Sequence, residues 1–354
     1  MVFYVYDEAL VMVSVIDDAV SAIWTGRYYK PGDFELYLRA SSQAAGFMRQ
    51  NCYIKRADKD SLCVIEHVEI QEDAESGDHY IVSGRDLKSL LGRRIVWSQT
   101  ALKGGVEDCL RKLVSENAID TAPERVIPRL VLGEKSGFAG TMAKQLTGKN
   151  LMEAVSDICT TYQCGCDVLF LAGEFQVIFY KGENRSYSQA GTDNPYVVFS
   201  AEFDNLISSI YVQDISEYQN VALVAGEGEG KARRRTVVGE ASGMDRYELY
   251  VDARDISSNE GEISESDYME QLYGRGLEKL EAALASETFE GEVDNTSMYI
   301  YGEDYFLGDI VAVKNKYGIT GNARVVEMIE CWDDGGYTAV PTFETCVEGG
   351  SLWQ

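Results

Sequence analysis

Apolar and polar positions alternate along most of the first 84 residues, which is the pattern of half-buried strands. In FELYLRA (34–40), for example, Phe34, Leu36 and Leu38 fall on one face of the expected strand. Similar runs occur at 11–17, 52–58, 62–73 and 79–84, with short polar turns between them. Strands at this spacing predict an antiparallel barrel or sandwich.

The pattern changes at VSGRDLKSLLGRRIV (82–96), where a strand-like start leads into a helical stretch and then into a basic, apolar strand. Ser83 and Asp86 have the spacing of a helix cap, and Gly92 stands where a short helix would end. Further helices are expected at 105–116, after a cap at Asn150, and at about 264–285, and a hairpin is expected around Gly173. The middle of the chain therefore predicts a mixed α+β module.

The alternating pattern returns from residue 196 and continues almost to the end of the chain. We therefore expect a mainly β protein with an α+β insertion, in which two β-barrel-like domains flank the mixed module. The expected domains are 1–84, 85–195 and 196–354, and the last includes the helix at about 264–285. The sequence shows no clear repeat between the two β regions.

Composition narrows the functional classes. Hydrophobic residues make up 45% of the chain and charged residues 25%, which is ordinary for a soluble globular protein. The formal net charge of −26 argues against a surface that grips nucleic-acid phosphates and against docking on anionic membranes. The sequence contains no apolar run of about 18 residues, so no membrane span is expected. The N-terminal segment lacks the basic start of a signal peptide, so we expect the eight cysteines to be reduced thiols.

Candidate catalytic groups are few. Cys159, Cys164 and Cys166 lie close together, but a zinc site would need a second ligand pair, and His67 and His79 are the only imidazoles. Buried thiols are therefore favoured over a metal site. A nucleophilic triad would also have to use one of these two histidines, and no G-x-S-x-G elbow accompanies either of them.

The loop GEGEGKA (226–232) resembles a phosphate-binding loop but fails its pattern. A P-loop would need Gly where Ala225 stands and Ser or Thr where Ala232 stands. A flexible connection between two strands is the favoured interpretation. The basic run that follows, which includes Arg233, Arg234 and Arg235, is open to three interpretations: a solvated loop, a contact with acidic neighbours in another subunit, or a nucleic-acid or lipid patch.

Several blocks, taken in order, resemble one family: the siphophage-type baseplate hub or tail-associated proteins of phages and prophages. The resemblance covers nearly the whole chain. The blocks are Trp24 with GDFELYL (32–38), VSGRDLKSLLGRRIV (82–96), NPYVVFSAEFDNL (194–206), YQNVALVAGEGEG (218–230), YELYVDARDI (247–256), YFLGDIVAV (305–313) and GITGNARVVEMIE (318–330).

The resemblance implies a structural protein of the tail tip, made in the bacterial cytoplasm and assembled into a phage or phage-tail-like particle. Such hubs are homotrimers whose subunits each offer two barrel-like domains, which adapts a six-fold tail tube to a three-fold tip. The implied partners are the tail tube or distal tail protein, the tape-measure protein, and tip or spike proteins. Neither catalysis nor a cofactor or metal is expected. The alternatives are a tail-associated peptidoglycan hydrolase and a receptor-binding tail protein.

Within this family interpretation, charged residues become candidate contacts between domains or subunits. The candidates are Arg85, Asp86, Arg93, Arg94, Arg233, Arg234 and Arg235. The net charge of −26 leads to a further hypothesis, that the ring has an acidic lumen through which DNA or the tape-measure protein passes without sticking. A net basic channel wall would rule this out.

Overall fold

The computed structural model describes residues 1–72, 77–189, 191–284, 286–293 and 298–345. Within them the protein is mostly β, with three α-helices. The strands are β1 (Phe3–Tyr6), β2 (Met12–Ile16), β3 (Ser21–Arg27), β4 (Asp33–Arg39), β5 (Tyr53–Arg56), β6 (Leu62–Gln71), β7 (His79–Asp86), β8 (Thr100–Gly105), β9 (Leu130–Leu132), β10 (Thr141–Leu146), β11 (Gly165–Leu171), β12 (Glu174–Tyr180), β13 (Val198–Ser200), β14 (Leu206–Asp214), β15 (Val221–Ala225), β16 (Arg235–Val238), β17 (Glu248–Asp252), β18 (Ser286–Val293), β19 (Ile310–Lys314), β20 (Thr320–Asp333) and β21 (Gly336–Thr345). The helices are α1 (Val106–Val114), α2 (Leu151–Tyr162) and α3 (Glu265–Glu281), with short 3-10 turns η1 (Ala45–Phe47), η2 (Leu87–Arg93), η4 (Pro123–Arg125), η5 (Ala201–Phe203), η6 (Gly230–Ala232), η7 (Gly243–Asp245) and η8 (Asn259–Gly261) and one π-helical turn, η3 (Ser115–Ile119).

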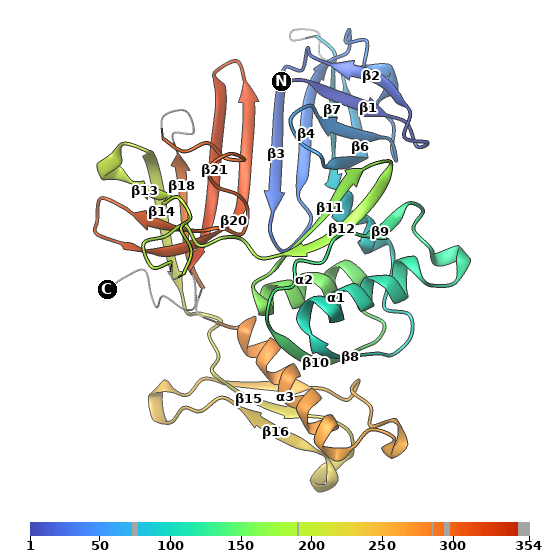
Figure 1. The fold of residues 1–354 in the computed structure, drawn as a ribbon, viewed down its shortest axis with the longest axis vertical. Coiled ribbons are helices and arrows are strands. Elements are labelled where there is room, and N and C mark those ends of the chain that lie inside the picture. The colour runs from blue at the N-terminus through green and yellow to red at the C-terminus, as the bar shows by residue number, and fades with distance from the viewer. Residues whose placement is uncertain (73–76, 190, 285, 294–297, 346–354) are drawn as a thin grey trace.

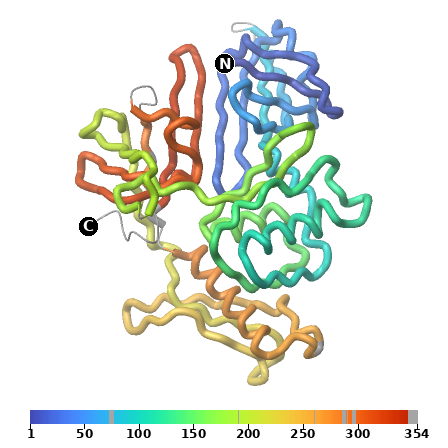
Figure 2. Tube along the Cα trace, in the orientation of Figure 1, coloured from blue at the N-terminus to red at the C-terminus, as the bar shows by residue number. Residues whose placement is uncertain are grey.

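One long sheet joins the two ends of the chain. Its strand order is β14-β18-β21-β20-β3-β4-β7-β6-β5-β1-β2, and β13 and β19 extend it beside β20. The joint is the antiparallel pairing of β3 with the second half of β20, from Arg27 opposite Glu327 to Ala22 opposite Trp332. Figure 1 shows β3 and β20 next to each other at the centre of the upper half, and Figure 2 shows the chain leaving this region and returning to it.

The first half of the sheet has its core on one face, as the alternation predicts. Phe34, Leu36 and Leu38 of β4 are almost fully buried, in a cluster with Phe3 of β1 and Ile54 of β5. The second half has a separate core built around Phe199, Phe289 and Phe343. The mainly β fold with an α+β insertion is confirmed. The barrel-like form is not confirmed, because within the described residues each outer strand of the long sheet is paired on one side only and the sheet stays open.

The mixed module lies below the first half of the sheet in Figure 1. The helices predicted at 105–116 and after Asn150 are α1 and α2, and the Asn150 side chain accepts hydrogen bonds from the amides of Met152 and Glu153. The hairpin predicted at Gly173 joins β11 to β12. The largest hydrophobic cluster of the described chain fills this module and includes residues of α1, α2 and β11.

The segment after residue 84 differs in detail from its prediction. Ser83 does not cap a helix, because β7 continues through it to Asp86 in register with β4 and β6. Asp86 is the capping residue, and the helix that follows is the 3-10 turn η2, which ends at Arg93, one residue beyond Gly92. Pairing on both sides of β7 thus overrides the local capping pattern.

The helix predicted at about 264–285 is α3, and Ser264 caps it as expected. It packs on a separate sheet of order β16-β15-β17, with Leu272 and Tyr268 buried against Val224 and Val251. This two-layer unit projects at the lower end of the molecule in Figure 1, away from the long sheet. Residues within the expected domain 196–354 thus contribute to two hydrophobic clusters. The expected domain boundaries after residues 84 and 195 stay predictions.

Candidate interaction surfaces

Arg85 and Asp86 lie where the first β region meets the mixed module. Arg85 is half exposed and donates two hydrogen bonds to the Glu66 carboxylate, at 2.7 and 2.8 Å. Asp86 is buried, and its carboxylate accepts from the amides of Gly32 at 2.8 Å and Lys88 at 3.1 Å. Burial raises the pKa of Asp86 to about 6, although Lys88 Nζ lies 3.2 Å from Oδ2. Asp86 is therefore a contact within the subunit.

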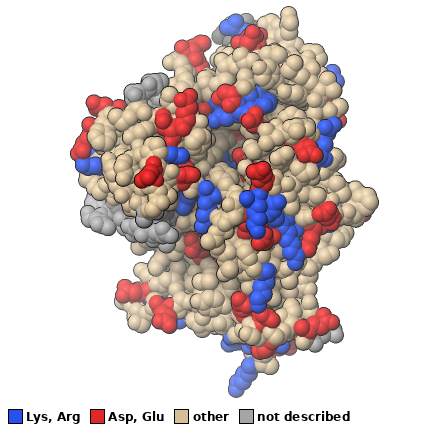
Figure 3. Space-filling view, in the orientation of Figure 1, with Lys and Arg blue, Asp and Glu red and all other residues tan. Residues whose placement is uncertain are grey.

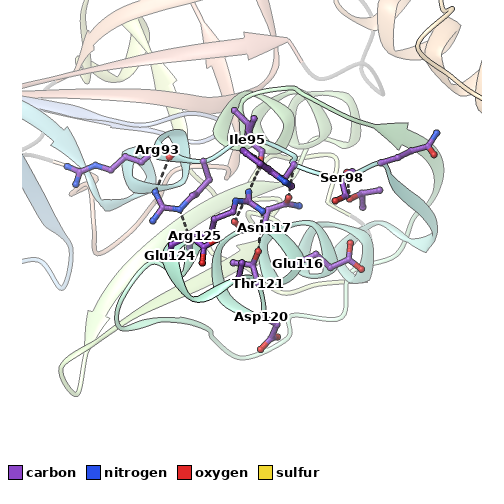
Figure 4. Close-up of a pocket in the computed structure, with 14 residues that line it drawn as sticks. Arg93, Ile95, Ser98, Glu116, Asn117, Asp120, Thr121, Glu124 and Arg125 are labelled. Carbon is purple, nitrogen blue, oxygen red and sulfur yellow. Dashed lines mark hydrogen bonds between the residues drawn. The ribbon is translucent and has the colours of Figure 1, made fainter.

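Arg93 and Arg94 line a cleft of about 720 Å³ between the end of η2 and the turns η3 and η4. Arg94 Nε donates to the carbonyl of Arg125 at 2.5 Å, which links the two segments that line the cleft. The Arg125 guanidinium in turn lies over the ring of Trp97, 5.0 Å from its centroid. Figure 4 shows the cleft with its lining side chains, among them Arg93 and Arg125.

The basic run lies in the two-layer unit of α3 and the β16-β15-β17 sheet, and none of its three arginines lines the cleft. Arg233 donates to the carbonyls of Gly226 and Ala225 and to Asp252, so its side chain is largely buried. Arg234 lies 3.5 Å from the Glu265 carboxylate and faces the ring of Tyr268 at 4.6 Å. Arg235 is exposed and donates to the carbonyl of Gly230 at 3.3 Å. The loop before it joins the antiparallel strands β15 and β16, as the sequence suggested.

The candidates therefore fall into three groups rather than one site. The structure joins Arg93 and Arg94 with Trp97 and Arg125, two residues that the sequence did not single out. In the sequence Trp97 directly follows Ile95 and Val96, so it resembles the end of a short apolar strand, and nothing there indicates its exposed position.

Within the described chain the long sheet has a free edge at β14, which pairs with β18 on one side only. Three of its apolar side chains are exposed: Ile207 at 63%, Ile210 at 61% and Val212 at 45%. An open edge that carries exposed apolar side chains, and no charge before Asp214, is a template for pairing with another chain.

A second free edge lies seven strands away from β14, on β6. Its first residues pair with β5, but the pairing stops at Val64, so residues 66–71 have β7 as their sole described strand partner. Ile70 is 58% exposed there. The pairs from β14 to β6 are all antiparallel, so these two edge strands run in opposite directions.

The charge of −26 is not spread evenly over the molecule. On the face shown in Figure 3, Lys and Arg side chains form a broken band down the middle, and Asp and Glu predominate toward the left and lower margins. This face therefore carries side chains of both charge signs, although the chain as a whole is strongly acidic.

Most of the described cysteines contribute to the core, and Cys346 lies outside the described residues. Cys159, Cys164 and Cys166 are fully buried, and burial raises the pKa of the Cys159 and Cys166 thiols. Among the residues that the structure describes, no group of three or more His, Cys, Asp or Glu is arranged to hold a metal ion. His79 is buried and stacks on Tyr37 with ring centroids 4.5 Å apart, whereas His67 is exposed beside Glu69.

Comparison with known protein families identifies the family of this chain. The model of the Siphovirus ReqiPepy6 Gp37-like protein family matches residues 2–343. The chain belongs to this family. The family resemblance found in the sequence, to siphophage tail proteins, is thus confirmed. No curated protein sequence shows significant similarity to the chain.

Solved structures of prophage tail proteins share the fold of this Gp37-like protein. The 43 kDa tail protein of prophage MuSo2 from Shewanella oneidensis superposes with a TM-score of 0.62 at 10% identity, covering 98% of each chain. A tail protein from Neisseria meningitidis gives 0.58 at 13% identity, covering 97% of this chain and 96% of the other. Prophage tail protein gp18 from Listeria monocytogenes gives 0.55 at 10% identity, covering 98% and 94%. In the described part of the protein, no helix has the length and apolar character needed to cross a membrane.

Proposed function

We propose that this Gp37-like protein is a structural hub of the tail tip, in which three copies form a ring that adapts the six-fold tail tube to a three-fold tip. Membership of a phage tail protein family and the fold of prophage tail proteins support a structural role without catalysis. The observation that carries the proposal is the single sheet in which the two β regions lie side by side through β3 and β20. Three such subunits would present six β regions.

Ring closure would use two of the free edges of the long sheet. The edge of β14 in one copy would pair with residues 66–71 of β6 in the next, a head-to-tail contact that closes when its rotation fits three copies. The eight strands from β14 to β6 alternate in direction, so the new pair would be antiparallel like those inside the subunit. Pairing would also cover the exposed apolar side chains of β14.

Within this proposal, the partners are the tail tube or distal tail protein, the tape-measure protein, and tip or spike proteins. The acidic lumen remains part of the same hypothesis, motivated by the charge of −26. Light scattering of the purified chain, alone and with a tail-tube protein, tests the ring directly. A mass of three subunits in either condition supports it, and a monomer in both conditions contradicts it.

A further inference from the structure

The cleft beside Trp97 is built from segments that meet only in the folded protein. The stretch from Arg93 to Thr100 forms one wall, and residues 116–125 of η3 and η4 form the other (Figure 4). The π-helical turn η3 places the Asn117 side chain between them, where Oδ1 accepts from the Trp97 amide at 3.0 Å and Nδ2 donates to the Leu113 carbonyl at 2.9 Å. The buried Asn117 thus fixes the wall that carries Trp97.

Two arginines of the cleft are held in place by backbone carbonyls. Arg125 donates to the carbonyl of Ile95 at 2.8 Å, and Arg94 donates to those of Arg125 and Val126. Arg93 is exposed and makes one long hydrogen bond, 3.4 Å, to Asn51. Within the described chain, which has a large excess of acidic residues, none of these three guanidinium groups forms an ion pair with a carboxylate. Arg94 and Arg125 are thus positioned by their hydrogen bonds, and all three groups retain positive charge for a ligand.

Apolar surface lies next to this charge. Trp97 is 66% exposed although Arg125 covers part of its ring, and Ile95 is 40% exposed on the same wall. Tryptophan and arginine are the residue types that dominate the energy of protein–protein interfaces, because each combines a large apolar area with a directed donor. Because this pair is already ordered, its side chains lose less conformational entropy when a partner binds.

Acidic side chains at the rim limit what the cleft can accept. Glu116, Asp120 and Glu124 line its other side. Lys112 lies 3.8 Å from Glu116, and Ser115 donates to Asp120. A uniformly anionic polymer such as DNA would be repelled by these carboxylates. A peptide with a single acidic position and an adjacent apolar side chain meets both parts of the cleft favourably.

We propose that this cleft docks a segment of another tail protein in which an acidic residue neighbours an apolar one. The carboxylate of that segment bonds Arg93 and faces Arg94, and its apolar side chain covers Trp97 and Ile95. The assignment of the partner to the tail rests on the proposed function. The cleft is formed by residues other than those of the free edges on β14 and β6, so docking and ring closure are separable.

Photo-cross-linking in the assembled particle tests the docking site. A benzoylphenylalanine replaces Ser98, which is exposed and lines the cleft, and a control replaces Tyr317, which is 74% exposed elsewhere. We expect the Ser98 position alone to cross-link to a different tail protein, at a peptide with adjacent acidic and apolar residues. A cross-link to a second copy of this chain, to nucleic acid or to glycan overturns the proposal, as does the absence of any cross-link at Ser98.

Binding of the cross-linked peptide, made synthetically and labelled, is then measured by fluorescence anisotropy. W97A and R93E should each weaken binding about tenfold or more, whereas the exposed controls R39E and Y317A should change it less than twofold. Equal binding by the cleft variants contradicts the proposal. W97A should keep the ring mass of the wild-type chain, so a lost ring and a lost peptide are distinguishable results.

Discussion

Arg56 and Glu330 are 274 residues apart in the sequence, yet Nη1 and Nη2 of Arg56 donate to the two carboxylate oxygens of Glu330 at 2.5 and 3.1 Å. Arg56 ends β5, and Glu330 lies on β20. Their side chains are 2% and 6% exposed, and the guanidinium faces the ring of Trp332 at 4.5 Å. The pair therefore links the first β region to the second in addition to the pairing of β3 with β20. Asp58 is a further acceptor for the Arg56 guanidinium.

Removal of Arg56 should strongly destabilise the protein. Arg56→Met leaves the buried Glu330 carboxylate without its cation, and breaking a buried pair in this way costs about 3–5 kcal/mol. The free energy of unfolding, measured with urea, should fall by that amount. The control is Arg85→Met, because the Arg85–Glu66 pair is much more exposed than the Arg56–Glu330 pair, and solvent-exposed pairs contribute about 0–1 kcal/mol. Equal losses in the two variants would contradict this account.

Tyr28 packs at the point where the two β regions meet the mixed module. Its hydroxyl donates to the Tyr180 carbonyl at 3.2 Å and accepts from the Gly182 amide at 3.3 Å. Glycines lie against its ring: a Cβ on Gly308 or on Gly165 would come within 2.3 Å of it. These close approaches leave no room for a side chain.

Gly308→Ala should therefore cost more than backbone strain alone. Gly308 has a φ of +92°, so alanine there adds strain to the clash with Tyr28. The matched control is Gly318→Ala, since Gly318 has a φ of +85° and no atom within 4 Å of the added Cβ. Thermal and urea unfolding should show an extra loss of about 1–3 kcal/mol for Gly308→Ala, as expected for overpacking. A loss no greater than that of the control would show that Tyr28 can move aside.

Asp86 should make stability fall as the pH rises through the mildly acidic range. Burial raises its pKa in the folded protein to about 6, above the value of about 4 expected in the unfolded chain. The folded state therefore holds this proton more tightly, and its stabilising effect, present below about pH 4, is lost as the pH rises through 6. Relative to Asp86→Asn, the wild-type free energy of unfolding should fall by up to about 3 kcal/mol between these limits.

The measurement for Asp86 is urea unfolding of both proteins from pH 4 to pH 7.5. Asp86→Asn also leaves the Lys88 ammonium without its carboxylate, which lowers stability at all these pH values. The informative quantity is therefore the change with pH in the difference between the two proteins. A constant difference would show that Asp86 titrates in the folded protein as it does in the unfolded chain.

Lysines on the β14 edge should prevent assembly without unfolding the subunit. Ile210 and Val212 are exposed, so Ile210→Lys with Val212→Lys leaves the core intact but places charge where a second chain would pair. In light scattering, we expect association to weaken about tenfold or more. The control Tyr317→Lys carries a charge on another exposed site and should assemble normally. Unchanged assembly of the edge variant would exclude β14 from the ring contact.

Elements that depend on neighbouring residues could be predicted from the sequence. The alternation in β4 follows from its one buried face, and the side chains of Asn150 and Ser264 cap α2 and α3 because capping is a contact over two or three residues. At Ser83 the same local logic failed, because β4 and β6 extend β7 beyond it. Pairing with distant strands is not visible in a local pattern.

The long-range contacts could not be predicted in this way. The pairing of β3 with β20 and the contact of Arg56 with Glu330 depend on which strands meet, and many registers fit the same alternation. In the candidate cleft, Arg93 and Arg94 were proposed as contacts from their charge. Trp97 and Arg125 were missed because their stacking depends on the fold of the intervening chain.

The β3–β20 ladder changes the cost of building the proposed ring. Of the six seams between β regions in such a ring, three would already be closed inside the subunits as each chain folds. Assembly then brings together three bodies rather than six, so fewer particles lose their freedom to translate and rotate, a loss worth several kcal/mol for each body added. The remaining seams could therefore be individually weak and still give a stable ring.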